Sequence, residues 1–186
     1  ETVIEHGEQQ TVAHNERRTY TKYTCGSETV ERISKLEVLD STGLIVQATT
    51  EWQHYDENDG ASKCGQVEWV KNPDGSWAMY DYDDGGRKFK ELLPYDDLSI
   101  PPTWDVTGCR EITYSYVPLP GDDNAFEDRF LPRTVSEAIG TQIVSQTFYV
   151  YRRESGNRVE IVQQDEDVTD ASGYDPSSTP SHPTTK

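Results

Sequence analysis

Alternation between β-forming and polar residues is the dominant pattern along this chain. From position 44 to position 52, every second residue is apolar, β-branched or aromatic: Leu44, Val46, Ala48, Thr50 and Trp52. A period of two places these side chains on one face of a β-strand. Similar alternation occurs in residues 111–117 and 142–151. An amphipathic helix of more than two turns is not expected anywhere, so the pattern predicts an all-β protein.

Strands are expected at intervals along most of the chain. They cover residues 18–24, 30–39, 44–52, 66–71, 76–82, 87–93, 111–117, 130–136, 142–151 and 158–163. Three connections, at residues 40–43, 72–75 and 83–86, begin with Asp or Asn and end with Gly. Such residues are typical of short hairpin turns. The sequence therefore predicts antiparallel meanders of hairpins, with three adjacent strands across residues 66–93.

The composition divides the chain into three parts. Residues 1–17 are polar and poorly patterned, which fits an N-terminal arm or an edge strand. Residues 18–164 carry the expected strands, apart from a loop at 94–107 that contains Pro101 and Pro102. Residues 165–186 are rich in Asp, Ser, Thr and Pro, as in a disordered linker or tail.

The charge of the chain limits its partners. With 34 acidic and 17 basic residues, the formal net charge is -17. A field of this sign repels phosphate backbones and anionic lipid, which disfavours nucleic acid. No apolar run has the length of a membrane span, so membrane insertion is not expected. Basic proteins and neutral glycans fit better as partners, and solubility alone is the plainer explanation of the charge.

Cys25, Cys64 and Cys109 lie far apart in the sequence. Zinc sites built from Cys require clustered ligands, and these three are not clustered. The spacing leaves open whether all three are reduced or two of them form a disulfide.

An internal repeat is the most informative feature. Residues 80–87 have the form Y-x-Y-D-x-x-G-R, and residues 149–158 form a degenerate copy with a longer turn. The signature residues are Tyr80, Tyr82, Asp83, Gly86 and Arg87 in the first copy, and Tyr149, Tyr151, Gly156 and Arg158 in the second. Alternate tyrosines can pack on one strand face, while Asp accepts backbone N–H groups across the turn. Gly adopts positive φ, and Arg can reach the Asp or stack on Tyr.

This signature resembles the YD repeat of bacterial Rhs proteins, the cage subunits of toxin complexes, and teneurins. The resemblance implies a curved, twisted sheet that forms part of a shell wall or an adhesive surface. It also implies a secreted or cell-surface protein of bacterial origin. The chain departs from the Rhs pattern at residues 175–178, where Asp-Pro-Ser-Ser lacks the Gly of the D-P-x-G box.

No motif for catalysis or cofactor binding is found, and an enzyme is not expected. His6, His14, His54 and His182 lack metal-binding spacing. The acidic loops at 56–60 and 122–124 are compatible with weak Ca²⁺ binding, but solvated acidic turns are the favoured interpretation of both.

Aromatic residues are the remaining candidates for a binding site. Trp104 lies in the Pro-rich loop, while Trp52, His54 and Tyr55 are adjacent, and His54 is expected as a surface strand residue. Such residues could stack on sugar rings, or they could simply pack across strands.

The sequence thus predicts a non-enzymatic structural or adhesive segment that associates with neighbouring repeats or with other copies. The alternative is an autonomous module that binds glycan or a surface protein through exposed aromatics.

Overall fold

The computed structural model describes residues 2–4, 14–95, 108–123, 129–165 and 182–184. These residues fall into two compact units, the first ending at Gly86 and the second beginning at Arg87. The expected loop at 94–107 lies outside the described residues from position 96 to position 107, Trp104 included, while Pro94 belongs to a strand. Most of the expected tail also lies outside the described residues.

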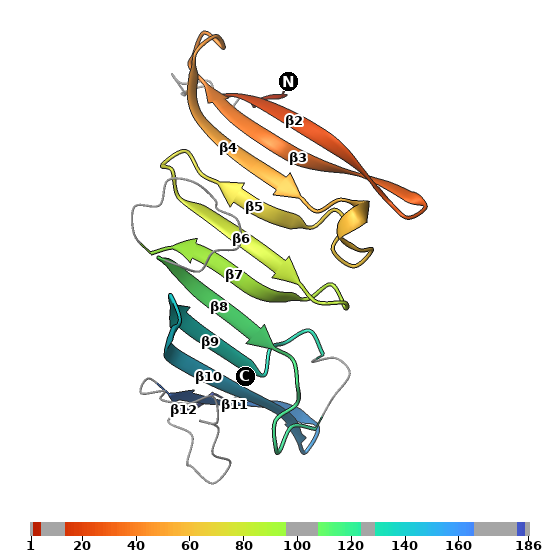
Figure 1. Cartoon of the computed structure of the whole chain (residues 1–186), viewed down its shortest axis with the longest axis vertical. Helices are drawn as coiled ribbons and strands as arrows, with labels where there is room; N and C mark the ends of the chain where they lie inside the picture. Colours follow the sequence, from red (N-terminus) through yellow and green to blue (C-terminus); the bar gives the residue numbers. More distant parts are fainter. Residues whose placement is uncertain (1, 5–13, 96–107, 124–128, 166–181, 185–186) are drawn as a thin grey trace. The chain divides into compact units, whose positions relative to one another are not determined.

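The first unit is an antiparallel meander (Figure 1). Its strands are β1 (Thr2–Ile4), β2 (His14–Cys25), β3 (Glu28–Leu39), β4 (Val46–His54), β5 (Val67–Lys71) and β6 (Trp77–Tyr82). Each strand pairs with the next in the chain. A single turn of 3-10 helix, η1 (Glu57–Asp59), follows β4 and is the one helical element in the described part of the chain.

The second unit has the same organisation. Its strands are β7 (Lys88–Pro94), β8 (Cys109–Ser115), β9 (Thr134–Ile139), β10 (Gln142–Glu154), β11 (Asn157–Asp165) and β12 (His182–Thr184). Again each strand pairs antiparallel with its successor. The all-β class and the antiparallel meanders predicted from the sequence are confirmed.

The predicted turns form through the expected residues. The amide of Gly43 donates to Asp40 O over 2.9 Å, and that of Gly75 donates to Asn72 O over 3.0 Å. Between β2 and β3, Gly26 and Ser27 form a two-residue turn in which Gly26 has φ 63°. Positive φ at the first central residue is characteristic of a type II′ hairpin turn, which suits the twist of the flanking strands.

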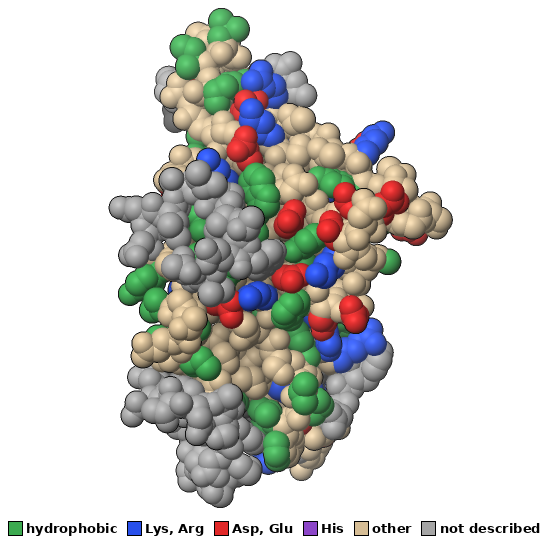
Figure 2. Space-filling model, in the orientation of Figure 1, with side chains coloured by type: hydrophobic (Ala, Val, Ile, Leu, Met, Phe, Trp, Pro, Cys, Tyr) green, Lys and Arg blue, Asp and Glu red, His purple; other side chains and the backbone are tan. Residues whose placement is uncertain are grey.

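The predicted common face of residues 44–52 is wrong at its first half. Val38 lies opposite Ala48 while Leu39 lies opposite Val46, so Gln47 is an extra residue in β4. Such a bulge reverses the alternation of side chains along the strand. Leu44 and Ile45 precede β4 and do not belong to it; Leu44 is 83% exposed, and Ile45 and Val46 are exposed as well. Figure 2 shows hydrophobic side chains on the β3–β4 connection.

Several strand limits differ from the prediction. Strand β2 begins at His14 rather than Arg18, and β9 covers residues 134–139 rather than 130–136. The prediction was misled at Phe130 by its β-propensity, because this side chain is exposed and precedes the strand. Strand β12, which pairs with residues 160–162, was not predicted because residues 165–186 have a linker composition.

One disulfide forms, which answers the question left open by the cysteine spacing. Cys25 at the end of β2 is bonded to Cys64, with 5.6 Å between the Cα atoms, and Cys109 is buried and is not part of a disulfide. The crosslink ties the β2–β3 hairpin to the loop that follows η1. Closing a loop with a sequence separation of 39 residues stabilises the fold by about 4 kcal/mol in the chain-entropy account.

Candidate functional site

The tyrosines of the first repeat copy are half-buried and contact the buried Tyr55. The Tyr82 hydroxyl donates to Val67 O on the neighbouring strand β5 over 3.0 Å. Tyr55, which is buried, donates its hydroxyl to the carbonyl oxygen of Tyr80 over 2.8 Å. The rings of Tyr55 and Tyr82 meet edge to face, with centroids 6.1 Å apart. Burial and, to a smaller extent, the Asp81 carboxylate raise the pKa of the Tyr55 hydroxyl well above its usual value.

The turn of the first copy is fixed by Asp83 and Gly86 in the roles that the sequence predicts. The carbonyl of Asp83 accepts the Gly86 amide over 2.9 Å, and its side chain accepts the Gly85 amide over 2.9 Å. Gly86 has φ 74°, and a Cβ there would lie 3.2 Å from the Ser62 carbonyl oxygen. Gln66 donates to both Ser62 O and Gly86 O. The turn therefore packs closely on the loop that contains Cys64.

Arg87, the last signature residue of the first copy, lies in the second unit. Its guanidinium carbon lies 4.4 Å from the ring centroid of Tyr116, so it stacks on a tyrosine, one of the two roles expected for it. It also donates to Arg129 O over 3.2 Å.

The second copy places its tyrosines on β10. The rings of Tyr149 and Tyr151 are parallel, with centroids 6.3 Å apart, and the Tyr151 hydroxyl donates to Pro132 O over 3.2 Å. The predicted longer turn is wrong: Glu154 lies opposite Asn157, so Ser155 and Gly156 alone make the turn. The additional residues of this copy extend β10, and Arg158 pairs with Arg153 across the hairpin.

A buried ion pair packs against Tyr151 of the second copy. The Arg133 guanidinium donates to both carboxylate oxygens of Asp122, at 2.5 Å and 3.3 Å, and also donates to Leu131 O. The Asp122 side chain is 0% exposed, and the Arg133 guanidinium lies 4.8 Å from the ring centroid of Tyr151. Sequence reasoning missed this pair and interpreted residues 122–124 as a solvated or Ca²⁺-binding loop. The neighbouring acidic residue Asp123 is exposed.

The aromatic candidates that the structure describes do not form an exposed surface for binding sugar. His54 and Tyr55 are buried, so the expectation that His54 is a surface residue is wrong. The imidazole of His54 packs 5.5 Å from the Tyr23 ring, and burial followed by the Arg32 charge lowers its pKa. Trp52 on β4 is half-buried, and Trp104 lies outside the described residues.

The acidic loop at 56–60 forms a helix cap. The Asp56 side chain accepts the Asn58 amide over 2.7 Å, and the Asp59 side chain accepts the Asp56 amide over 2.9 Å. These two bonds satisfy donors at the start of η1. Among the described residues, no group of three or more His, Cys, Asp and Glu side chains could hold a metal ion.

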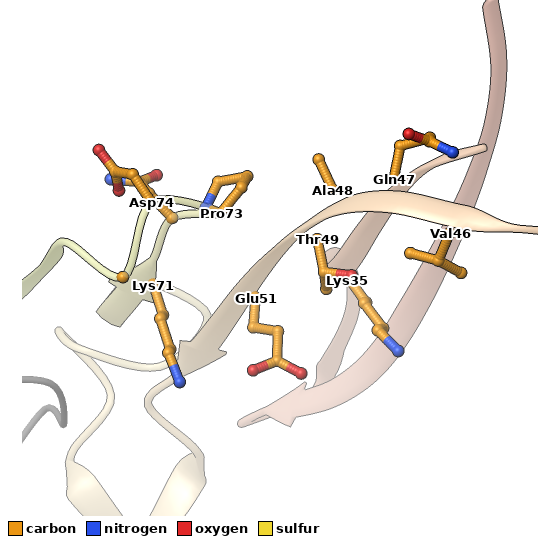
Figure 3. A pocket seen from close by; sticks show the side chains of 11 residues that line it. Lys35, Val46, Gln47, Ala48, Thr49, Glu51, Lys71, Pro73 and Asp74 are labelled. Carbon is orange, nitrogen blue, oxygen red and sulfur yellow. The ribbon is translucent and has the colours of Figure 1, made fainter. Parts of the chain in front are cut away.

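An open polar groove of about 670 Å³ lies on strands β3, β4 and β5 and the turn at 72–75 (Figure 3). Lys35, Glu51 and Lys71 lie directly opposite one another on these three strands, which gives a row of alternating charge. Such cross-strand pairs of opposite charge stabilise a sheet. Acidic and basic side chains also lie next to each other on the face seen in Figure 2.

Next to this row, Glu37 is held by two cations. Arg17 Nε lies 2.6 Å and Lys35 Nζ lies 2.8 Å from its carboxylate oxygens. The hydrogen bonds from Arg17 and Lys35 lower the pKa of Glu37 to about 2. The residues that line the groove include no aromatic side chain, so it can bind a ligand by hydrogen bonds and charge but not by stacking on rings.

Comparisons with known proteins leave the family open. No protein-family model matches the sequence, and no curated protein matches it. In the described part of the chain, no helix has the length and hydropathy needed to cross a membrane.

Proposed function

We propose that this chain is a non-enzymatic structural or adhesive segment of a larger, secreted or cell-surface YD-repeat protein, in which it forms part of a β-sheet wall. The proposal combines the resemblance of residues 80–87 and 149–158 to the YD repeat with the arrangement of these residues.

One observation carries the proposal. In both copies the hydroxyl of the second signature tyrosine donates a hydrogen bond to a backbone carbonyl elsewhere in its own unit. Tyr82 donates to Val67 O, and Tyr151 donates to Pro132 O. A hydroxyl that donates to a backbone carbonyl in this way contributes to stability, whereas a hydroxyl used for ligand binding or catalysis has to remain available. The repeat signature is therefore best explained as a set of residues that stabilises the sheet.

Covalent and ionic crosslinks support the same function. The Cys25–Cys64 disulfide joins a hairpin to a distant loop, and disulfides persist in oxidising, extracellular environments. Arg110 makes a two-pronged contact with Glu137 on the adjacent strand, at 2.7 Å and 2.9 Å. Crosslinks of this kind suit a protein that has to keep its shape outside the cell.

The proposal predicts that the isolated chain depends on neighbours. Urea unfolding followed by far-UV circular dichroism and Trp fluorescence should be broad or should shift with protein concentration, and sedimentation should detect association. A single transition, coincident in both probes and independent of concentration, would contradict the scaffold function because it identifies a self-sufficient domain. Binding to a glycan array that is lost in Trp52→Ala would contradict it as well.

A further inference from the structure

The tip of the β2–β3 hairpin, residues 20–33, extends past the end of β4 (Figure 1). Strand β4 pairs with β3 at residues 35–39, which lie at the base of the hairpin. The tip packs instead on the loop at 60–66, through the Cys25–Cys64 disulfide and a hydrogen bond of 2.9 Å from Arg32 Nε to Gly65 O. A segment that is held apart from the main strand ladder can open locally while the rest of the sheet stays folded.

Gly65 is the point at which the loop meets the tip. It is buried, and a Cβ there would lie 2.9 Å from Cγ2 of Val30 on the hairpin. Its amide donates to Tyr55 O over 2.9 Å, directly after the last residue of β4. The loop is therefore fixed between the hairpin tip and the end of β4.

His54, the last residue of β4, is buried at this junction. It is 3% exposed, and its ring centroid lies 5.5 Å from that of the buried Tyr23 of β2. The Nδ1 atom of His54 is buried without a hydrogen-bond partner. A protonated imidazole has a donor at each ring nitrogen, and burial of such a charge without a partner is costly.

The charges around His54 add to this cost. Among the described residues, the charge that acts on the imidazole is that of Arg32 on β3, which disfavours a second positive charge. The side chain that faces His54 from β2 is the Tyr23 ring. In the loop, Lys63 is ion-paired with a carboxylate of β6, while on β5 the charges that act on Glu68 are those of other carboxylates. Burial, followed by the Arg32 charge, lowers the pKa of His54 below its ordinary value of 6.5.

We propose that this junction is a pH-sensitive contact: acid protonates His54, and the tip of the β2–β3 hairpin then separates from the loop at 60–66. Separation lets water reach the imidazolium and moves it away from Arg32. The Cys25–Cys64 disulfide keeps the tip attached, so the opening is local and reversible, and it exposes Tyr23. This inference does not depend on the proposed scaffold function.

The direction of the pH effect follows from proton linkage. An imidazole in the open junction is solvated and titrates near 6.5, whereas the closed junction titrates lower. The closed junction therefore binds fewer protons than the open one at intermediate pH. Its stability is complete above about pH 6.5 and is lost as the pH falls towards the pKa of the closed form.

Hydrogen exchange of the full chain tests the proposal, because a two-stranded hairpin without support is marginally stable and exchanges its amides. Protection factors, corrected for the intrinsic exchange rate at each pH, are compared at about pH 7.5 and about pH 5. Protection at residues 20–33 and 62–66 should fall at least about threefold at the lower pH, while protection of β10 should stay constant. In His54→Phe, which keeps an aromatic ring but cannot be protonated, the loss should disappear.

His182→Phe is the matched control, because it removes a histidine from β12 of the second unit and should leave the loss unchanged. The C2–H resonance of His54 in the unmodified chain should titrate below pH 6.5. If far-UV circular dichroism shows that His54→Phe is unfolded, His54→Gln replaces it and the same titration still applies. Constant protection in the unmodified chain, a loss retained without His54, or titration of His54 at or above pH 6.5 would overturn the proposal.

Discussion

The two copies of the repeat signature use the same tyrosine–carbonyl bond but support it differently. In the first unit, Tyr82 packs against the edge of Tyr55, and its turn rests on a loop held by the Cys25–Cys64 disulfide. In the second unit, Tyr151 packs against Arg133, whose charge is neutralised by buried Asp122. Both copies therefore have the tyrosine and its hydrogen bond to a carbonyl. The side chain that packs against the tyrosine ring differs: it is an aromatic residue in the first copy and a member of an ion pair in the second.

The turns of the two copies differ as well. The first copy has Asp83 to accept two amides and a glycine in close contact with another loop. The second has a two-residue turn whose central residues, Ser155 and Gly156, both have positive φ, as in a type I′ hairpin. The second copy thus needs no Asp at the position held by Arg152. A signature defined by Asp and Gly at fixed spacing identifies the first copy well and the second poorly.

The largest expected effect comes from breaking the ionic support of the second copy. Asp122→Ala leaves the buried guanidinium of Arg133 unpaired, which should lower the free energy of unfolding of the second unit by about 3–5 kcal/mol. Hydrogen exchange at β10 amides measures this loss. Asp123→Ala is the matched control, because that neighbouring residue is exposed and its replacement should cost much less. Equal losses of unfolding free energy in the two variants would show that the ion pair does not stabilise the second unit.

Reduction of the disulfide should weaken the first unit selectively. Loss of the Cys25–Cys64 crosslink is expected to cost about 2–4 kcal/mol and to speed amide exchange in β2, β3 and the loop at 62–66. The double variant Cys25→Ser, Cys64→Ser should behave like the reduced protein. Exchange at β10 serves as the internal control. Equal acceleration in both units would refute a local role for the crosslink.

The two turn glycines offer a direct contrast. Gly86→Ala combines positive φ with a Cβ only 3.2 Å from the Ser62 carbonyl oxygen, whereas a Cβ at Gly156 meets nothing within 4 Å. Both variants carry the cost of positive φ, about 1 kcal/mol or more, and Gly86→Ala adds the displacement of a backbone carbonyl. Urea unfolding should therefore rank Gly86→Ala as the more destabilising. The opposite order would mean that the turn does not rest on the loop at 62–66.

Much of the fold was predictable because it depends on local chemistry. The turns at 40–43, 72–75 and 83–86 were predicted from Asp, Asn and Gly, and the roles of Asp83 and Gly86 followed from the same chemistry. The disulfide pairing was not predictable, since it depends on how the β2–β3 hairpin meets a loop distant in sequence.

Other features escaped prediction for the same reason. The bulge at Gln47 depends on cross-strand register, which the alternation of a single strand does not contain. The Arg133–Asp122 pair joins two segments that lack a common motif. The burial of His54 and Tyr55 likewise comes from packing against Tyr23 and Tyr82, and this removed them as surface candidates.

The smallest effect tests what the two copies have in common. Tyr82→Phe and Tyr151→Phe each remove one hydroxyl and leave one carbonyl, of Val67 or Pro132, without that donor. Each should cost about 1 kcal/mol, because the ring and its packing are retained. Tyr20→Phe, at an exposed position of β2, is the control and should be nearly neutral. A similar loss in Tyr82→Phe and Tyr151→Phe would mean that the tyrosine–carbonyl bond contributes equally beside an aromatic ring and beside an ion pair. A clear loss in one copy alone would mean that the surroundings, and not the signature, determine the value of the bond.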